Sequence, residues 1–412
     1  MINVCDCIMG SGKSSSCINY MNEHPEKRYI YITPYTDEAE RIVNACPSLD
    51  FREPSDKNPE TGWSKSGDTI RLVQLGKNVA STHQCFKFYT EVLLEYIQAG
   101  GYTLMIDENV SVLEEYKDIC PTDLQLMVDG GYIEKNGDTY KYTGKEYGGK
   151  WGREAIRFIK SRNMIEMRES NGASYYYWAI PENLLTAFQD VIIMTYMFEG
   201  TDMYYYLKMR NIPYQYIGIR HDSAGYHFSD TLENENKWTG LKEKIHICDR
   251  KKLNAIGNDE YALSMHWFAI HQNDAVMEQL KKNISNWFNN INRGIENNKR
   301  LWATIGESYG MLRGRGVWVN NLAFNYRATN DYADRVILAY PVNIFTNVTK
   351  KNYYIRNGLV YDEDRYALSV MVQWIFRSAV RNGKDIWIYI PSSRMRRLLC
   401  EWLDRLEGGE AM

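Results

Sequence analysis

A glycine-containing turn near the start of the sequence has the residues needed to hold phosphate groups. Segment 8–14 (IMGSGKS) follows an apolar stretch at 2–8 and precedes a helix-like stretch at 14–21. In such a strand–turn–helix connection, backbone N–H groups can surround phosphate oxygens, and the helix presents its positive end to the same anion. The sequence therefore predicts a phosphate site made of Gly10, Ser11, Gly12, Lys13 and Ser14.

Two of these residues carry side chains suited to a nucleoside triphosphate. Lys13 would reach the β- and γ-phosphates, and the Ser14 hydroxyl would hold Mg²⁺. The full pattern has a glycine where this chain has Cys7. A glycine turn without a phosphate role is the alternative, which the flanking strand and helix make the weaker one.

A pair of acids supplies the partner for this loop. The apolar segment 103–106 leads directly into Asp107 and Glu108. At the end of a strand, Asp107 could hold Mg²⁺ through water, and Glu108 could orient or deprotonate an attacking water molecule. An apolar run ending in two acids is weak evidence alone, but it gains weight after a phosphate loop. ATP and Mg²⁺ are therefore the expected ligands.

A third set of polar residues lies near the end of the chain, at Gln373, Arg377 and Arg381. The arginines are four apart, so a helix through both would place them on one face. Aimed across a cleft, one or both could neutralise charge developing on the γ-phosphate, an effect of ~10³–10⁵ in rate. Surface ion pairs or phosphodiester contacts are the alternative roles.

Strands alternate with helices along most of the chain, which predicts parallel sheets with helices on both faces. The expected strands lie at 2–8, 28–33, 69–73, 102–106, 190–195, 244–248, 300–305, 335–340 and 385–390. The expected helices lie at 14–21, 37–44, 274–291, 364–380 and 394–406.

The alternation breaks between residues 112 and 185. This stretch contains an expected helix at 121–129, a β-hairpin at 132–142 with Asn136 and Gly137 in its turn, and helical spacing of apolar residues at 155–159. We interpret 112–185 as an insertion in a first domain. The predicted division is a first domain at 1–225, a polar linker at 226–242 and a second domain at 243–412.

Composition restricts the choice of partners. The net charge of −3 argues against a protein that coats nucleic acid electrostatically, although local charge placement sets the field at a binding site. Segment 298–356 holds nine basic residues against three acidic ones, and a solvated surface explains it as well as a binding groove does. The 32 Tyr and 11 Trp are expected mainly in the core, with stacking on bases as the second use.

Other classes of site receive no support. The sequence has no CxxC pair, so neither zinc nor a disulfide framework is indicated. It has no signal peptide and no uninterrupted apolar run of about 20 residues. We therefore expect a cytoplasmic protein with no membrane partner.

With these residues in order, nearly the whole chain resembles superfamily 2 helicases, and within them the compact helicases of phages and prophages. Segment 8–14 looks like motif I, Asp107-Glu108 like motif II, and segment 373–381 like motif VI. The resemblance implies two RecA-like domains with ATP and Mg²⁺ in the cleft and nucleic acid, DNA in preference to RNA, across both. It also implies a bacterial host cytoplasm, phage replication proteins as partners, and no requirement for an oligomer.

The resemblance also supplies contacts to the nucleic acid backbone, for which hydroxyl and basic side chains are suited. Thr195 falls where motif III would link the ATP state to strand contacts. A satisfied turn is the commoner role for any one of these hydroxyls. The residues placed in motifs that face nucleic acid are Thr33, Ser81, Thr82, Arg327 and Thr329.

The chain departs from the family pattern in three of the motifs. Motif II continues into Asn109 rather than the residues of the named subclasses, and Tyr196 stands where motif III usually has alanine. The motif VI arginines are four apart where the family commonly has three, which leaves open whether Arg377 or Arg381 is the arginine finger.

The leading hypothesis is a nucleic-acid-stimulated ATPase that translocates on or unwinds DNA. A phage packaging-motor-type ATPase is the first alternative, although the second half has no obvious acidic triad for the nuclease that such motors carry. A nucleotide-gated clamp or interaction module without unwinding is the other, and the intact Lys13, Asp107 and Glu108 speak against it.

Overall fold

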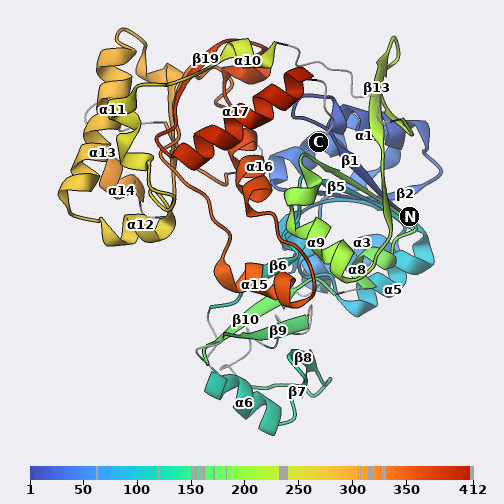
Figure 1. Ribbon diagram of the computed structural model, residues 1–412. Coiled ribbons are helices and arrows are strands. Elements are labelled where there is room, and N and C mark those ends of the chain that lie inside the picture. Colours follow the sequence, from blue (N-terminus) through green and yellow to red (C-terminus); the bar gives the residue numbers. More distant parts are fainter. Residues whose placement is uncertain are drawn as a thin grey trace. The chain divides into compact units, whose positions relative to one another are not determined.

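The computed structural model describes residues 1–61, 64–117, 121–149, 156, 159, 163–169, 172–181, 183–231, 240–306, 308–313, 320–326 and 331–408. The chain forms two compact units, Met1–Glu235 with Asn347–Tyr361 and Asn236–Thr346 with Asp362–Met412. Each unit contains its own parallel sheet with helices (Figure 1). The expected fold class, α/β with two RecA-like parallel-sheet domains and an insertion in the first, is confirmed.

The first unit is built on a sheet in which every neighbouring pair of described strands is parallel. In spatial order the strands are β12 (Tyr214–Tyr216), β1 (Ile2–Asp6), β11 (Asp190–Thr195), β5 (Tyr102–Asp107), β2 (Arg28–Thr33), β4 (Asn78–Thr82) and β3 (Phe51–Arg52). Strand β11 therefore separates β1, which leads into the phosphate loop, from β5, which ends in Asp107.

Both faces of this sheet are covered, because alternate residues of a strand point to opposite sides. Val4 and Leu104 belong to one buried cluster with α3, α5 and α9, whereas Cys5 and Met105 belong to another with α1 and α2. The helices of this part of the unit are α1 (Lys13–Glu23), α2 (Thr36–Ala45), α3 (Lys65–Gln74), α4 (His83–Phe86), α5 (Glu91–Gly100), α8 (Asn183–Thr186) and α9 (Asp202–Met209).

The insertion is a separate antiparallel sheet with a helix, α6 (Pro121–Asp129). Its described strands, in spatial order, are β6 (Leu113–Glu115), β10 (Ser174–Ala179), β9 (Asn163–Arg168), β8 (Thr139–Tyr142) and β7 (Ile133–Asn136). The expected hairpin is confirmed as β7 and β8, and Gly137 in its turn has a φ of 61° that favours glycine. Most of segment 155–159 lies outside the described residues.

The strand expected at 69–73 is wrong, because these residues belong to helix α3. Ser64 caps that helix by accepting a hydrogen bond from the N–H of Gly67. Thr69, Leu72 and Val73 are buried at helical spacing, so a short apolar run with β-branched residues was ambiguous between the two structures. The next strand, β4, begins at Asn78, after this helix has ended.

A short segment from the second half of the sequence belongs to the first unit. Helix α15 (Val348–Arg356) lies against the insertion and α9, where Lys350 pairs with Asp202 and Arg356 donates to the carbonyl oxygen of Arg168 (2.6 Å) (Figure 1). Tyr354 is buried and stacks on Tyr361, with ring centroids 5.8 Å apart. The second domain expected at 243–412 is therefore interrupted by residues 347–361.

The expected linker is also shorter than its predicted range of 226–242. Strands β13 (Gly218–Asp222) and β14 (Gly225–Ser229) form a hairpin that packs on α1, so the first residues of that range belong to the first unit. Residues 232–239 lie outside the described part, and α10 (Leu241–Lys244) already belongs to the second unit. The hairpin is polar because it lies on the surface of the first unit, and not because it is a linker.

The second unit contains a parallel sheet with the described order β15 (Ile245–Ile247), β19 (Ile386–Tyr389), β18 (Ile337–Ala339), β16 (Arg300–Thr304) and β17 (Asn321–Ala323). Its remaining helices are α11 (Lys251–Asn254), α12 (Met265–Ile270), α13 (Ala275–Asn286), α14 (Ser308–Leu312), α16 (Glu363–Ile375) and α17 (Ser393–Gly408). Among the described residues of the chain, no helix is long and apolar enough to span a membrane.

Candidate phosphate and magnesium site

The carboxyl ends of the parallel strands gather the polar residues of the first unit. Strand β1 ends at Asp6, β2 at Thr33, β4 at Thr82, β5 at Asp107 and β11 at Thr195. Parallel strands end at the same edge of a sheet, and ligands of open α/β sheets bind outside that edge. Residues that are far apart in the sequence therefore meet beside the loop that follows β1.

The loop from Cys7 to Gly12 turns the chain from β1 into α1 through two glycines with positive φ. Gly10 and Gly12 have φ values of 77° and 93°, in the left-handed region that favours glycine, and Gly12 is the N-cap of α1. The ammonium group of Lys13 donates to the carbonyl oxygens of Cys7 and Ile8, the latter at 3.0 Å. The side chain of Lys13 therefore lies against the loop that is expected to hold phosphate.

The hydroxyl of Ser14 and the carboxylate of Asp107 lie side by side. Ser14 Oγ is 3.4 Å from Asp107 Oδ2, which also accepts a hydrogen bond from the Tyr31 hydroxyl at 3.0 Å. A hydroxyl and a carboxylate are oxygen donors of the kind that Mg²⁺ prefers. The sequence pointed to Ser14 and Asp107, but it contained no sign of Tyr31, which is one of several apolar and aromatic residues in a buried strand.

The charge of Asp107 is held in an unfavourable surrounding. Burial raises its pKa to about 6, and the neighbouring charge of Glu108 acts in the same direction. The hydrogen bond from Tyr31 and the charge of Lys13 favour the ionised form and oppose part of this increase. A divalent cation would relieve the same penalty, because it supplies the opposite charge that the carboxylate lacks.

Glu108 occupies a backbone conformation that few residues other than glycine adopt. Its φ is 61°, and its N–H donates to the carbonyl oxygen of Met194 at 3.0 Å. Its Oε2 atom is buried without a hydrogen-bond partner among the residues that the structure describes. Strained backbone and an unsatisfied buried polar atom are features that concentrate at functional sites.

The segment after β11 is attached directly to the phosphate loop. The carbonyl oxygen of Thr195 accepts a hydrogen bond from the N–H of Cys7 at 3.1 Å, and Asp6 Oδ2 accepts one from the N–H of Phe198 at 2.9 Å. The expected coupling residue, Thr195, therefore meets the loop through its backbone. Its role in coupling stays a prediction.

The three residues expected to face nucleic acid in the first unit lie at strand ends but differ in exposure. Thr33 and Ser81 are buried, with 0% and 4% of their surface exposed, so their hydroxyls do not form an outer surface in this conformation. Thr82 is partly exposed and caps α4 by accepting from the N–H of Cys85. The burial of Thr33 and Ser81 argues against their assignment, which no observation tests directly.

The expected helix at 364–380 ends earlier than the sequence predicted. Helix α16 stops at Ile375, and Ser378 adopts an extended conformation before a 3-10 turn at 379–382. Its hydroxyl donates to the carbonyl oxygen of Ile375 at 2.6 Å, which satisfies a group at the helix end. The expectation that Arg377 and Arg381 share one helical face is therefore wrong.

These arginines also differ in their surroundings. Arg377 is 6% exposed, whereas Arg381 is exposed on the 3-10 turn. Gln373 is partly buried within α16. The two remaining candidates of the second unit, Arg327 and Thr329, lie outside the described residues.

One contact of the site had no signal in the sequence. A ring nitrogen of His83, Nε2, lies 2.9 Å from the backbone carbonyl oxygen of Asp107 and so links the start of α4 to the end of β5. In the sequence, His83 directly follows Thr82, which was expected to face nucleic acid, and nothing there indicated a contact with Asp107. Only the parallel order of β5, β2 and β4 explains why His83 reaches this position.

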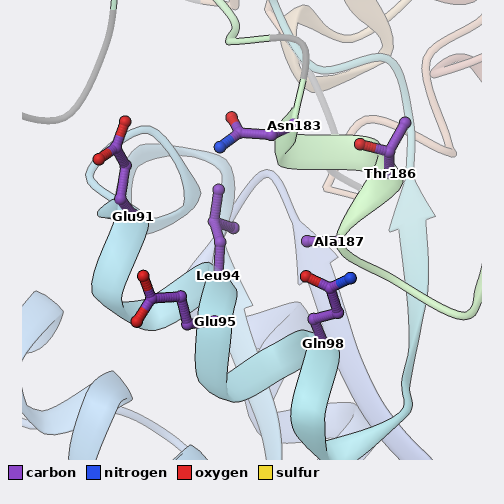
Figure 2. Close-up of a pocket in the computed structure, with 7 residues that line it drawn as sticks. All are labelled: Glu91, Leu94, Glu95, Gln98, Asn183, Thr186 and Ala187. Atoms are coloured by element: carbon purple, nitrogen blue, oxygen red, sulfur yellow. The ribbon is translucent and has the colours of Figure 1, made fainter.

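A cavity of about 280 Å³ lies elsewhere in the first unit, between α5 and the segment around α8 (Figure 2). Its lining is polar and partly acidic, with two glutamates one helical turn apart on α5. None of the phosphate-loop residues lines it. The lining residues are Glu91, Leu94, Glu95, Gln98, Asn183, Thr186 and Ala187.

Comparison with known proteins places the chain in a family. The chain is 35% identical over 421 residues to the SPbeta prophage-derived protein YonV of Bacillus subtilis (strain 168), and the alignment covers 98% of each protein. The chain belongs to the YonV family. In agreement, residues 239–403 of this chain match the family described as the YonV C-terminal Rossmann-like domain.

Solved structures give a remote likeness. An XPD helicase aligns with a TM-score of 0.41 and 10% identity, covering 98% of this chain and 95% of the helicase. Xpd4 of S. tokodaii aligns with a TM-score of 0.44 and 11% identity, covering 98% and 94%. At these scores the function has to be argued from the site itself.

The raised pKa of Asp107 predicts that ionisation of this carboxyl lowers the stability of the folded protein. A carboxyl whose folded-state pKa is raised stabilises the fold below its ordinary pKa of 3.8, and this contribution is lost as the pH rises through about 6. Each pKa unit corresponds to about 1.4 kcal/mol, so the ionised carboxylate costs about 3 kcal/mol at pH 8. Asp107→Asn should gain that amount at pH 8 and little at pH 4, in the absence of metal.

Urea denaturation of the wild type and of Asp107→Asn at both pH values measures the difference in free energy of unfolding. Unfolding should be followed with a spectroscopic probe in the first unit. Asp129→Asn, which changes an exposed carboxylate on α6, serves as the control and should show no such gain. A pH-independent difference for Asp107→Asn would contradict the stated origin of the shift.

Proposed function

We propose that this protein is an ATPase of the superfamily 2 helicase type that is stimulated by nucleic acid. It would use hydrolysis to translocate on or unwind DNA. The observation that carries the proposal is the approach of Ser14 to Asp107 at 3.4 Å, beside Lys13 and Glu108. These four residues come from two loops at one edge of a parallel sheet, and each has a chemical role in phosphoryl transfer.

The phosphate chain of ATP would lie along the loop between β1 and α1. The N–H groups of the loop and the positive end of α1 favour an anion there. Lys13 would exchange its present acceptors, the carbonyl oxygens of Cys7 and Ile8, for phosphate oxygens. The exchange requires rotation of one flexible side chain and no change of the fold.

Ser14 and Asp107 would hold Mg²⁺, and their oxygens fit that ion. When bound, Mg²⁺ supplies positive charge that neutralises the phosphate oxygens. Asp107 must be ionised for this role, and its pKa of about 6 leaves it ionised at neutral pH. The Tyr31 hydroxyl would orient the carboxylate through its hydrogen bond to Oδ2.

Glu108 would act on the water molecule that attacks the γ-phosphate. A general base needs a free acceptor atom within hydrogen-bond reach of the water, and Glu108 Oε2 is such an atom among the described contacts. The left-handed backbone at Glu108 and its bond to Met194 fix the direction in which this side chain leaves the chain.

The second unit would complete the site with a guanidinium group. Arg381 is the better candidate for the finger, because its side chain is exposed, whereas Arg377 is buried. Gln373 belongs to the same segment, 373–381, which resembles motif VI. Charge neutralisation from a second unit would make hydrolysis depend on how the units close.

Nucleic acid would be the partner whose binding stimulates ATP hydrolysis. Thr82, Arg327 and Thr329 are its proposed contacts, with Thr195 passing the state of the phosphate loop to them. DNA is favoured over RNA, and the prophage origin of the Bacillus relative suits a role in phage DNA replication with phage replication proteins as partners. Thr82, which is partly exposed, is better placed for this than the buried Thr33 or Ser81.

The first test is an ATPase assay with Mg²⁺, without polynucleotide and with single-stranded DNA, duplex DNA or RNA. We expect turnover to increase several-fold with DNA. Lys13→Ala should lower kcat by about 10²-fold or more, as loss of one preorganised charge at a reacting oxyanion does. Lys27→Ala is the matched control, because Lys27 bonds to the Tyr20 hydroxyl away from the loop.

Turnover that no polynucleotide increases would remove the motor function. Turnover that survives Lys13→Ala unchanged would remove the phosphate-loop assignment. Circular dichroism of each variant separates loss of activity from loss of fold.

The arginine finger has its own test. Arg381→Ala should lower kcat by about 10³-fold while the KM for ATP changes by only a few-fold, because the guanidinium group acts on charge that develops in the transition state. Arg405→Ala, at an exposed arginine of α17 in the same unit, should leave both values unchanged. A wild-type kcat in Arg381→Ala would exclude Arg381 as the finger.

A further inference from the structure

The β13–β14 hairpin is fixed along α1, the helix that begins at the phosphate loop (Figure 1). Asn19 donates to the carbonyl oxygen of Tyr226 at 3.0 Å, and the rings of Tyr20 and Phe228 meet edge to face at 5.9 Å. The hairpin is therefore a packed element of the first unit, and its side chains have defined positions relative to the loop.

One side chain of the hairpin reaches back to the loop itself. A Cβ atom added to Gly12 would lie only 2.3 Å from Cδ1 of Tyr226, closer than real Cβ contacts. The ring of Tyr226 therefore lies directly on Gly12, the residue before Lys13. Gly12 is required both for its φ of 93° and for the space that this ring occupies.

A second ring continues outward from the first. The imidazole of His221 lies 4.3 Å from the Tyr226 ring, centroid to centroid, with 33° between their planes. His221 is exposed on the surface of the unit. The Tyr226 ring thus contacts both Gly12 of the phosphate loop and the exposed His221, and we refer to Tyr226 and His221 as the ring pair.

We propose that the ring pair is the base-binding site for the nucleotide whose phosphates occupy the loop, a proposal that rests on the function proposed above. The base would stack on the exposed side of the pair, against His221. Tyr226 is a positioning residue, because its ring contacts both Gly12 and His221 and so links the imidazole to the loop.

Three observations support a nucleotide base as the ligand. The ring pair starts at the residue next to Lys13, so it is tied to the place where the phosphates would lie. Ring faces attract planar bases by stacking, which accepts any base. The pair is also held by a hairpin bonded to α1, so the base and the phosphates would be recognised by one rigid part of the first unit.

Calorimetric titration of the full-length protein with ATP and with tripolyphosphate, each with Mg²⁺, separates the base from the phosphates. Wild-type protein should bind ATP more tightly than tripolyphosphate. His221→Ala should weaken ATP binding by about tenfold, the size expected for the loss of one stacked base, and leave tripolyphosphate affinity unchanged. His221→Phe should keep wild-type affinity for ATP, because it preserves a ring.

Tyr226→Ala should reproduce the effect of His221→Ala, with ATP binding weakened and tripolyphosphate binding kept. Phe228→Leu is the matched control in the same hairpin, since its ring contacts Tyr20 and not the loop, and it should bind both ligands like the wild type. This comparison distinguishes a role in base binding from a general effect on the hairpin.

The outcomes separate the two proposals. If wild-type protein binds neither ligand, the proposed function fails. If ATP affinity is unchanged in His221→Ala, or if both ligands weaken equally, the base site is wrong while the phosphate site stands. A His221→Ala protein that binds ATP normally but loses affinity for single-stranded DNA would assign the ring pair to nucleic acid and also overturn the base site.

Discussion

Asp107 is buried where its negative charge is disfavoured, and the contacts of the candidate site offset part of that cost. Burial and Glu108 raise its pKa, while the Tyr31 hydroxyl and the Lys13 ammonium group favour the ionised form. Ser14 adds a second oxygen at 3.4 Å. A cation that bound the ionised carboxylate would remove this penalty, so that binding at this site would also stabilise the fold.

The parallel sheet is what allows five separate strand ends to contribute to one site. Because β11 lies between β1 and β5, its last residues bond to both neighbours: Thr195 accepts from Cys7, and Met194 accepts from Glu108. The loop that would hold phosphate and the carboxylates that would hold metal are therefore linked through one strand. Any shift of β11 would be transmitted to both sides of the site.

Much of this site could be predicted from the sequence because its signals are local. The glycines at 10 and 12 need left-handed backbone, and a lysine and a serine after them, with a pair of acids at a strand end, fit few sites besides a phosphate site. The strand expected at 69–73 failed for a related reason: a short apolar run fits either a strand or one face of a helix, and the cap at Ser64 decides for the helix.

The remaining features depend on contacts between distant parts of the chain, which no short pattern encodes. Ser378 ends α16 early and separates Arg377 from Arg381, although their spacing favoured one helical face. Helix α15 joins the first unit because Lys350 and Tyr354 find partners there, more than a hundred residues after the predicted domain boundary. Tyr226 lies on Gly12 only because a polar stretch folds into a hairpin along α1.

A single-turnover experiment on Glu108→Gln with labelled ATP and Mg²⁺ tests whether Lys13, Ser14, Asp107 and Glu108 form a hydrolytic site. We expect the variant to bind ATP with nearly wild-type affinity and to hydrolyse it about 10²–10⁴-fold more slowly, the usual contribution of a general base. Glu91→Gln, on α5, should hydrolyse ATP like the wild type. Conversion of bound ATP to ADP by Glu108→Gln at the wild-type rate would contradict the account.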